Sequence, residues 1–395
     1  MDTLFSSRMN TVKPSAIRQL LEYGSDPSMI SFGGGYPDPD LFPLSELESI
    51  YKQQVTQNGR FSLQYTFSAG LNNLRKQLAD RMKIENINCD ENNILITQGG
   101  QQGLDLVAKM LIDKGDAIIT ESPTFVGGLL AFNPYQPRYI TIPMDEEGLI
   151  TDILEEKLKN EKKIKFLYTV PDFHNPTGIT MSLARRMKLI ELANNYNFII
   201  LEDTPYREIR YQGVKLPTLK SLDTQGRVIY LGSFSKTISP GIRVGWTVAS
   251  EEITNKLDML KLAADTQTST INMSLVSTYL AEYDLDSHIN RIKNTYYQKK
   301  EIMLSAIQSS FPKCIDYTRP DGGLFLWLTF PEGFDSQKFM IEHAIPKAKV
   351  AYVPGAPFYA NNPENNFARI SYSTNSAENI EKGISRLGKL LHEYL

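Results

Sequence analysis

The sequence predicts an α/β fold, with a large domain built on a mostly parallel, seven-stranded sheet between helices and a smaller α+β domain after it. From residue 93 to residue 249, short apolar runs typical of strands alternate with helical segments. Strands that are apolar on both faces indicate a parallel sheet covered by helices. The loops that follow such strands meet at one edge of the sheet, where ligands bind. The predicted strands are Asn93–Thr97, Ala117–Thr120, Tyr139–Ile142, Lys165–Val170, Phe198–Leu201, Val228–Leu231 and Val244–Ala249.

Helices are predicted between the strands and before the first of them. Those between the strands include Gln101–Ile112, Ser182–Asn195 and Glu251–Leu262. Pro14–Tyr23 reads as a short helix because proline suits a first helical turn and Gly24 follows its end. Another helix begins at Ser45, which forms a capping-box pattern with Glu48, and a further one covers residues 70–82.

Beyond residue 290 the pattern changes to that of an α+β module. The elements expected there are a helix over Asp286–Ser309, strands over Cys314–Tyr317 and Gly323–Leu328, a further helix, and strands over Val350–Val353 and Ala368–Tyr372. A chain of 395 residues is long enough for two domains, because single cores rarely exceed about 250–300 residues. We expect a large domain over 45–285 and a small domain over 286–395, with an N-terminal helix and substrate loop (1–44) associated with the small domain.

Composition and charge argue against several protein classes. The net charge of −3 gives no electrostatic case for binding nucleic acid or an anionic membrane. The two cysteines are far apart and the four histidines do not cluster with them, so no metal site is expected. No apolar run is long enough for a membrane span or a secretory signal. These observations predict a cytoplasmic protein.

The run Leu231-Gly-Ser-Phe-Ser-Lys236, with Arg243 after it, is the most informative stretch of the chain. A lysine at the end of a buried strand is partly desolvated, which favours the neutral amine that attacks a carbonyl. The hydroxyls of Ser233 and Ser235 and the guanidinium of Arg243 suit a phosphate. Together they suggest pyridoxal 5′-phosphate, a phosphorylated aldehyde that bonds to a lysine. Taken alone, the Ser-x-Ser-Lys pattern is weak, and an ordinary surface lysine is the better explanation of it.

Polar residues follow two other predicted strands. Asp203 comes after Phe198–Leu201, and its carboxylate could keep the pyridine nitrogen of the cofactor protonated. Asn175, in a turn bracketed by prolines, and Tyr206 could donate hydrogen bonds to the phenolic oxygen of the cofactor. An acidic helix cap and an ordinary turn are the alternative interpretations of Asp203 and Asn175.

The loops after the first two strands supply further candidates. Gly100 and Gln101 begin a predicted helix, where backbone N–H groups bind phosphate. Phe125 could stack on the pyridine ring. Helix capping and core packing are the competing explanations for these residues.

Together these residues resemble the fold-type I, class I pyridoxal-phosphate aminotransferases, and most closely the branch of 2-aminoadipate, kynurenine and broad-range aminotransferases. The resemblance runs from Ile17 to the C-terminus. Six motifs in order carry it, which is a specific combination. They are Leu63-Gln-Tyr65, Thr97-Gln-Gly-Gly-Gln101, His174-Asn-Pro-Thr-Gly178, Glu202-Asp203-x-x-Tyr206, Ser233-x-Ser-Lys236 with Arg243, and Phe367-Ala-Arg369.

The resemblance implies a role for each site residue. Lys236 bonds to the cofactor and moves protons, and Asp203 pairs with the ring nitrogen. The other implied cofactor contacts are Asn175 and Tyr206 at the phenolic oxygen, Phe125 on the ring face, and Gly100, Gln101, Ser233, Ser235 and Arg243 at the phosphate.

The resemblance also implies how substrates and subunits are arranged. Tyr65 reaches the phosphate of a neighbouring subunit, which makes the working unit a homodimer. Arg369 holds the α-carboxylate of the substrate, while Gly34 and Gly35 line the substrate pocket with Asn175. Arg18 matches a position that faces a distal carboxylate in some relatives, although a solvated arginine on a helix face explains it as well.

The activity implied is transfer of an amino group between an L-amino acid (glutamate, 2-aminoadipate, or a large apolar or aromatic one) and a 2-oxo acid such as 2-oxoglutarate. The two half-reactions follow a ping-pong order through Lys236. β-Elimination or decarboxylation with the same cofactor is one alternative. Another is a non-catalytic ligand-sensing domain of a transcription regulator, disfavoured because about 13 residues precede the first predicted helix and no basic patch is present.

Overall fold

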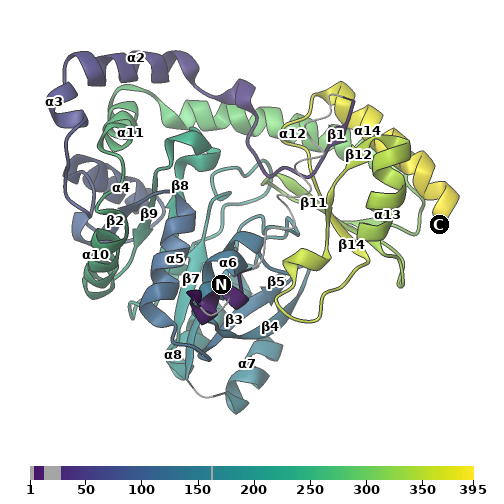
Figure 1. Cartoon of the computed structure of the whole chain (residues 1–395), viewed down its shortest axis with the longest axis horizontal. Helices are drawn as coiled ribbons and strands as arrows, with labels where there is room; N and C mark the ends of the chain where they lie inside the picture. Colours follow the sequence, from purple (N-terminus) through teal and green to yellow (C-terminus); the bar gives the residue numbers. More distant parts are fainter. Residues whose placement is uncertain (1–3, 13–27, 162) are drawn as a thin grey trace.

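An eight-stranded sheet forms the centre of the computed structural model, which describes residues 4–12, 28–161 and 163–395 (Figure 1). The strands lie in the order β2-β9-β8-β7-β6-β3-β4-β5. Their bounds are β2 (Ile94–Thr97), β3 (Ala117–Ser122), β4 (Arg138–Asp145), β5 (Gly148–Leu149), β6 (Ile164–Thr169), β7 (Ile199–Asp203), β8 (Val228–Ser233) and β9 (Gly245–Val248). The predicted helix Pro14–Tyr23, which includes Arg18, lies outside the described residues.

The sheet is mostly parallel, as predicted. Strands β4, β3, β6, β7 and β8 run parallel to one another, whereas β9 is antiparallel to both β8 and β2. All seven predicted strands are present, and the eighth is the two-residue β5, antiparallel to β4. The parallel run brings the carboxyl ends of β3, β6, β7 and β8 to one edge.

Helices cover both faces of this sheet, as the alternation of apolar runs requires. Ile118 and Ile119 are adjacent in β3 but belong to different hydrophobic cores, because successive side chains point to opposite faces. The core on one face includes residues of α5 and α6, and the core on the other face includes residues of α7 and α8. The helices around the sheet are α5 (Gly100–Leu111), α6 (Val126–Phe132), α7 (Thr151–Asn160), α8 (Leu183–Tyr196), α9 (Leu219–Leu222) and α10 (Glu251–Asp265).

A third core lies beside β2 and β9, where α2, α4 and α11 pack, and the short α3 contacts α2 and α11. These helices are α2 (Leu44–Thr56), α3 (Gly59–Ser62), α4 (Asn72–Ile84) and α11 (Thr270–Glu282). The predicted capping box at Ser45 is wrong, because α2 already begins at Leu44 after Pro43 and no side chain caps it. The hydroxyl of Ser45 instead donates to the carboxylate of Glu46 at 2.7 Å.

A second, four-stranded antiparallel sheet has the order β10-β11-β14-β13. The long helix α12 (Leu285–Ser310) crosses the molecule from α11 towards this sheet, where α14 (Ala377–Tyr394) packs along it (Figure 1). The strands are β10 (Asp316–Tyr317), β11 (Phe325–Thr329), β13 (Val353–Pro354) and β14 (Phe367–Ser371). The remaining helical segments here are α13 (Ser336–Phe339) and the π-helix η9 (Met340–Ala348).

The N-terminal segment joins this region through β1 (Ile30–Ser31), which pairs in parallel with β12 (Val350–Ala351). The single strand predicted over Val350–Val353 is therefore wrong, since β12 and β13 belong to different sheets. Through the β1 pairing, the glycine loop that starts at Gly33 lies against the C-terminal part of the chain. The short 3₁₀ segments are η2 (Ser7–Asn10), η4 (Pro39–Leu41), η5 (Glu91–Asn93), η6 (Asn133–Tyr135), η7 (Phe234–Lys236), η8 (Pro240–Ile242) and η10 (Ala356–Phe358).

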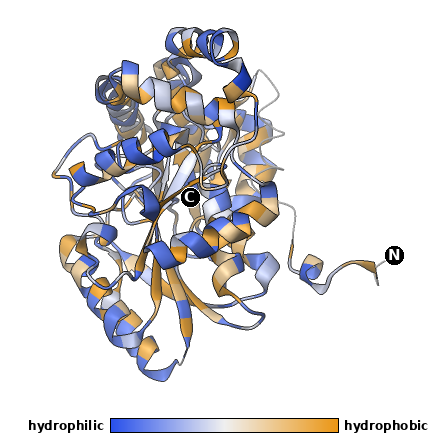
Figure 2. Cartoon of the chain, turned by 90° about the vertical axis from the view of Figure 1, so that its left-hand side faces the viewer, coloured by the Kyte–Doolittle hydropathy of each residue, from blue (hydrophilic) through white to orange (hydrophobic). Residues whose placement is uncertain are grey.

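Figure 2 shows mostly hydrophobic strands at the centre and helices of mixed character around them. Across the described ranges, we find no helix both long enough and apolar enough to cross a bilayer. The same residues contain no cluster of three or more His, Cys, Asp or Glu side chains that could hold a metal ion.

Candidate active site

A cavity of about 370 Å³ lies at the edge of the large sheet where β6, β7 and β8 end. It joins residues from opposite ends of the chain. The predicted site residues in its lining are Gly34, Gly35, Gly100, Gln101, Phe125, Asn175, Asp203, Tyr206, Ser233, Ser235, Lys236, Arg243 and Arg369.

Two groups of residues form most of the polar lining. One group, which we call the sheet-edge side, lies at or just after the ends of β6, β7 and β8 and consists of Asn175, Asp203, Tyr206 and Lys236. The other group, the glycine-loop side, follows β1 or lies in β14 and consists of residues 34–36 and Arg369, which bonds the backbone of Gly33.

Lys236 ends the short η7 turn after β8 and is partly buried in the cavity wall. Its Nζ donates to the backbone oxygen of Gly35 at 2.8 Å and lies 5.9 Å from the centre of the Tyr206 ring. Burial, together with the charges of Arg369 and Arg243, lowers the pKa of Lys236 to about 8. A neutral amine, which is the form that attacks an aldehyde, is therefore accessible near neutral pH.

Asp203 is the last residue of β7 and is buried. The phenol of Tyr168 donates to its Oδ2 at 2.8 Å. Burial raises the pKa of Asp203 to about 7, while the Tyr168 bond opposes this rise and the charge of Glu121 adds to it. No cation among the described residues contributes to this pKa. A protonated ring nitrogen would supply the positive partner that this carboxylate lacks.

Asn175 and Tyr206 lie next to each other although they follow different strands. The Asn175 Nδ2 donates to the Tyr206 Oη at 3.2 Å. Burial raises the pKa of Tyr206 to about 12, so its hydroxyl stays protonated at neutral pH and remains a donor. Both side chains can therefore donate to one oxygen atom in the cavity.

Arg369 is buried in the middle of β14. Its Nη1 donates to the Asn175 Oδ1 at 2.8 Å and its Nη2 to the Gly33 oxygen at 2.7 Å, while Nε has no hydrogen-bond partner among the described residues. Burial lowers the pKa of Arg369 to about 10, which still leaves a cation at neutral pH. The guanidinium also lies 4.2 Å from the centre of the Phe325 ring. Such a buried cation suits a carboxylate ligand.

The loop between β2 and α5 brings backbone donors to the other end of the cavity. Gly99 has φ +72°, and a Cβ atom there would lie 2.6 Å from the Arg243 Nη2, so glycine is required. That Nη2 donates to the Gln98 oxygen at 2.9 Å. Helix α5 begins at Gly100, so its first N–H groups are available to an anion.

Two serines and an aromatic ring complete this end. The Ser235 backbone N–H donates to the Ser233 Oγ at 3.1 Å, and the two hydroxyls lie 2.9 Å apart. A Cβ atom at Gly127 would lie 2.4 Å from the Phe125 ring, so this glycine makes room for the ring beside the cavity. The Gln101 side chain donates to the Gly127 oxygen at 2.7 Å.

The donor set fits pyridoxal phosphate. Hydroxyl, guanidinium and helix N-terminal donors suit its phosphate, the partnerless carboxylate of Asp203 suits its ring nitrogen, and the amine of Lys236 suits its aldehyde. All of these groups share one cavity.

One predicted residue that the structure describes, Tyr65, is not part of this lining. Tyr65 is 79% exposed and borders a separate hollow with Gln64 and Thr270. Arg18 lies outside the described residues. Their roles stay predictions.

The sequence interpretation missed several supporting residues. Tyr168 supports Asp203, and Tyr36, with 53% exposure, lines the cavity. Glu121 at the end of β3 accepts from the Thr169 hydroxyl at 2.6 Å and lies 3.0 Å from the His174 Nε2. An acidic residue at the end of a buried strand is the same signal that pointed to Asp203, and it could have identified Glu121.

Comparison with known proteins gives consistent matches along the chain. The family model described as aminotransferase class I and II matches residues 34–387. The aromatic-amino-acid aminotransferase 1 of Thermococcus litoralis is 40% identical over 98% of this chain and 94% of its own length. A Pyrococcus horikoshii kynurenine aminotransferase in complex with PMP has a TM-score of 0.95 at 39% identity, covering 100% of this chain and 98% of that one. The alpha-aminoadipate aminotransferase LysN of Thermus thermophilus, complexed with N-(5′-phosphopyridoxyl)-L-leucine, has a TM-score of 0.92 at 36% identity, covering 99% and 98%.

Proposed function

The chain belongs to the class I and II aminotransferase family, and on this premise we propose that it transfers the amino group of an L-amino acid to a 2-oxo acid such as 2-oxoglutarate. The family, the fold type, the aminotransferase activity and the pyridoxal phosphate cofactor predicted from the sequence are confirmed. The proposed amino donors are glutamate, 2-aminoadipate and large apolar or aromatic amino acids. The names of the aromatic-amino-acid, kynurenine and aminoadipate relatives support this range.

One observation carries the proposal. The amine of Lys236, the buried carboxylate of Asp203 and the buried guanidinium of Arg369 line a single cavity. The amine has a lowered pKa, the carboxylate has no cationic partner and the guanidinium has no carboxylate partner among the described residues. An amino acid and a pyridoxal ring together supply the groups that these three residues lack.

When bound, pyridoxal phosphate supplies an aldehyde that bonds to amines and a ring that withdraws electrons from the neighbouring carbon. Arg369 holds the substrate α-carboxylate with two parallel N–H donors, which orients the Cα–H bond. The freed Lys236 amine takes the proton from Cα as general base, a role for which a pKa near the working pH is suited. The donor leaves as a 2-oxo acid before the acceptor enters, which gives ping-pong order.

The cofactor contacts proposed are those predicted from the sequence. Asp203 keeps the ring nitrogen protonated, Asn175 and Tyr206 donate to the phenolic oxygen, and Phe125 stacks on the ring. The phosphate ligands proposed are Gly100, Gln101, Ser233, Ser235 and Arg243. In the substrate pocket we propose Gly34 and Gly35 as lining and Arg18 as the partner of a distal carboxylate.

The proposed unit is a homodimer in which Tyr65 reaches the phosphate site of the other subunit. Several exposed apolar side chains between residues 55 and 67 support this proposal. They are Val55 (52% exposed), Phe61 (57%), Leu63 (69%), Tyr65 (79%) and Phe67 (80%). We also propose the domain bounds 45–285 and 286–395, with 1–44 joined to the smaller domain, and a cytoplasmic location stays a prediction.

The absorption spectrum of the purified protein tests the function. We expect a yellow band from the bound cofactor that glutamate or 2-aminoadipate bleaches and that 2-oxoglutarate restores. Alanine should leave the band unchanged. Release of free ammonia would instead assign β-elimination, and release of carbon dioxide would assign decarboxylation. A band that no amino acid changes would assign a ligand-sensing protein.

A further inference from the structure

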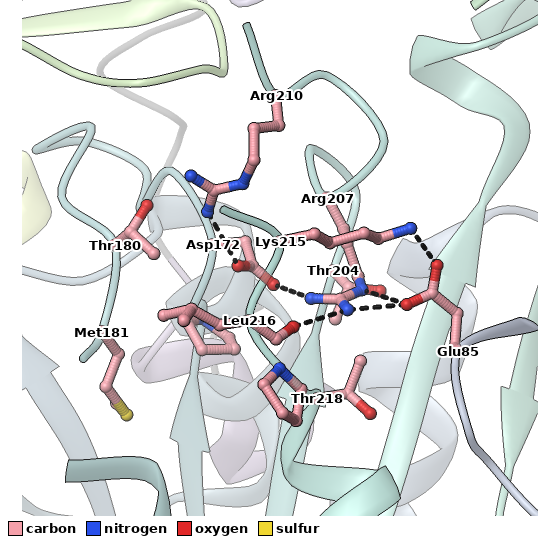
Figure 3. A network of polar contacts seen from close by, with 12 residues as sticks. Glu85, Asp172, Thr180, Met181, Thr204, Arg207, Arg210, Lys215, Leu216 and Thr218 are labelled. Atoms are coloured by element: carbon pink, nitrogen blue, oxygen red, sulfur yellow. Dashed lines mark hydrogen bonds and ion pairs between the residues drawn. The ribbon is translucent and has the colours of Figure 1, made fainter. Parts of the chain in front are cut away.

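A buried network of charged side chains joins the loops that carry Asn175 and Tyr206. Figure 3 shows the part of it around Asp172, Arg207 and Glu85. Its core consists of Glu85, Asp172, Arg186 and Arg207, each less than 10% exposed. Lys215 and Arg210 lie around this core, paired with Glu85 and 3.8 Å from Asp172 respectively. None of these side chains lines the described cavity. The network therefore touches no part of the proposed reaction directly.

Arg207 is the centre of the network, and it directly follows Tyr206 in the chain. Its Nη1 donates to the Asp172 Oδ2 at 2.8 Å. Its Nε and Nη2 donate to the Glu85 Oε2 at 3.0 and 2.6 Å, and Nη2 also donates to the Leu216 oxygen at 2.8 Å. Every nitrogen of this guanidinium is thus bonded, as the dashed lines of Figure 3 show, and these bonds fix the position of the planar group.

Asp172 lies in the loop after β6, three residues before Asn175. Its Oδ1 accepts from the Arg186 Nη2 at 2.8 Å, and the same Nη2 donates to the Pro171 oxygen at 3.0 Å. Burial by itself would raise the pKa of Asp172, but the charges of Arg186 and Arg207 hold it below its ordinary value. The carboxylate is therefore ionised, and its two oxygens bond two different arginines.

The Asp172–Arg207 bond is a link between two loops that come from different strands. Asp172 and Asn175 belong to the loop after β6, and Arg207 and Tyr206 belong to the loop after β7. The same two loops are joined a second time, because the Asn175 amide donates to the Tyr206 hydroxyl at 3.2 Å. Because the linked residues are one and three positions from these two donors, a shift of either loop would separate them.

We propose that Arg207, held by Asp172 and Glu85, is a positioning residue that keeps Tyr206 against Asn175 so that both donate to the phenolic oxygen of bound pyridoxal phosphate. This inference rests on the proposed roles of Asn175 and Tyr206. Two donors at that oxygen stabilise its ionised form. Their loss moves the pH at which the bound cofactor changes colour upwards.

Arg207→Lys and Asp172→Asn test the proposal. Lysine keeps the charge but cannot bond Asp172 and Glu85 in the same fixed fork. We expect the colour change to move up by about one pH unit and kcat to fall about tenfold. KM should change much less than kcat, because Arg369 is also held by its bond to the Gly33 oxygen, which does not depend on either loop.

Asp223→Asn is the matched control. Asp223 is also a buried carboxylate, bonded to Lys220 at 3.1 Å and to the Val228 N–H at 2.9 Å, but it lies at the other end of β8. We expect it to lower the thermal unfolding temperature without moving the colour change. If Asp172→Asn alone does not fold, the positioning role is tested with Arg207→Lys and with the double variant Asp172→Asn/Arg207→Gln, in which both charges are removed.

The outcomes separate this proposal from the proposed function. Folded Arg207 and Asp172 variants that keep the wild-type colour change and kcat would overturn the positioning role and leave the aminotransferase activity intact. A wild-type protein whose band no amino acid changes would overturn the proposed function alone, whereas a protein that forms no such band would overturn both. An upward shift in both Arg207→Lys and Asp172→Asn, and none in Asp223→Asn, supports the positioning role.

Discussion

The sheet-edge side and the glycine-loop side of the cavity hold their functional groups in different ways. On the sheet-edge side, Asp203 and Lys236 lie at or just after the ends of adjacent strands and have pKa values of about 7 and about 8. On the glycine-loop side, Arg369 is a cation at neutral pH that is tied to the Gly33 backbone. Groups that gain and lose protons therefore lie opposite a group whose charge is constant.

Two hydrogen bonds cross between the sides, from Lys236 to Gly35 and from Arg369 to Asn175. Each of these two donors also binds one of the proposed ligands. A cofactor that bonds to Lys236 replaces the first bond, and a substrate carboxylate at Arg369 competes with the second. Because the two sides hold different kinds of group, we infer that proton transfer and substrate orientation depend on different residues. Variants of each side can test this inference.

The largest effect is expected on the sheet-edge side. Lys236→Ala removes both the covalent attachment and the general base, so turnover should fall by at least about 10⁴-fold. The yellow band of the lysine-bound cofactor should disappear, as absorption spectroscopy would show. Lys300→Met is the control, because Lys300 is also buried but bonds Gln212 and Pro320 outside the cavity. Ordinary turnover by Lys236→Ala would refute the assignment.

On the glycine-loop side, Arg369→Leu removes the carboxylate anchor but leaves Lys236 and Asp203 in place. We expect kcat/KM for every amino acid to fall about 10³-fold, mostly through KM, since a buried charged bond contributes several kcal/mol. Steady-state kinetics with glutamate and an aromatic amino acid would measure this effect. Arg369→Lys keeps the charge without the paired donors, so its kcat/KM should lie between those of the wild type and Arg369→Leu. A fall in kcat alone would contradict the separation of the two sides.

The sheet-edge side was predictable because it follows from local patterns. Asp203 and Lys236 each come shortly after a short apolar run, and parallel strands bring such positions to one edge. Helix α11 (Thr270–Glu282) was missed because its buried residues, which include Met273, Leu275 and Val276, do not lie on one face and give no helical period. Strand β5 (Gly148–Leu149) was missed because two residues are too few to form a pattern.

The contacts that join the two sides could not be predicted from any local pattern. The Gly33 oxygen and Arg369 lie at opposite ends of the chain, and their bond depends on the β1 and β12 pairing that brings the N-terminal segment to the C-terminal region. Arg207 was overlooked for the same reason. Its partner Glu85 lies at the end of α4, far from it in sequence, so no local pattern around Arg207 indicates this ion pair.

The pH dependence of Lys236 tests how the two sides are coupled, because the charge of Arg369 on one side lowers the pKa of Lys236 on the other. With a pKa of about 8, the neutral amine grows about fivefold from pH 7 to 8 and less than twofold from pH 8 to 9. The rate at which cofactor-free protein combines with pyridoxal phosphate should follow this curve in a stopped-flow measurement. A lysine with its ordinary pKa would instead gain about tenfold per pH unit throughout.

Arg369 is one of the charges that lower the pKa of Lys236. In Arg369→Leu the curve should therefore move to higher pH, because the neutral amine loses part of its advantage over the ammonium. Arg138→Leu is a control, since Arg138 pairs with Glu161 and does not line the cavity. An unchanged curve in Arg369→Leu would mean that burial alone sets this pKa.

The smallest effect is expected at Tyr65, which belongs to neither side of the cavity in its own chain. Tyr65→Phe removes one hydroxyl that we propose reaches the phosphate in the other subunit. Losing one such hydrogen bond should weaken cofactor binding about tenfold, as equilibrium dialysis would show. Tyr51→Phe is a control, because that hydroxyl bonds Asn272 within the chain at 3.0 Å.

Mixed dimers show from which chain the Tyr65 hydroxyl comes. When Tyr65→Phe and Lys236→Ala chains are combined, the active site has its own Lys236 and faces a partner that still carries Tyr65. If Tyr65 acts across the interface, this site binds the cofactor as tightly as the wild type does. If Tyr65 acts within its own chain, the same site keeps the tenfold weaker binding. The mixed dimer thus gives opposite results for the two arrangements, even though both predict the same loss in the pure Tyr65→Phe protein.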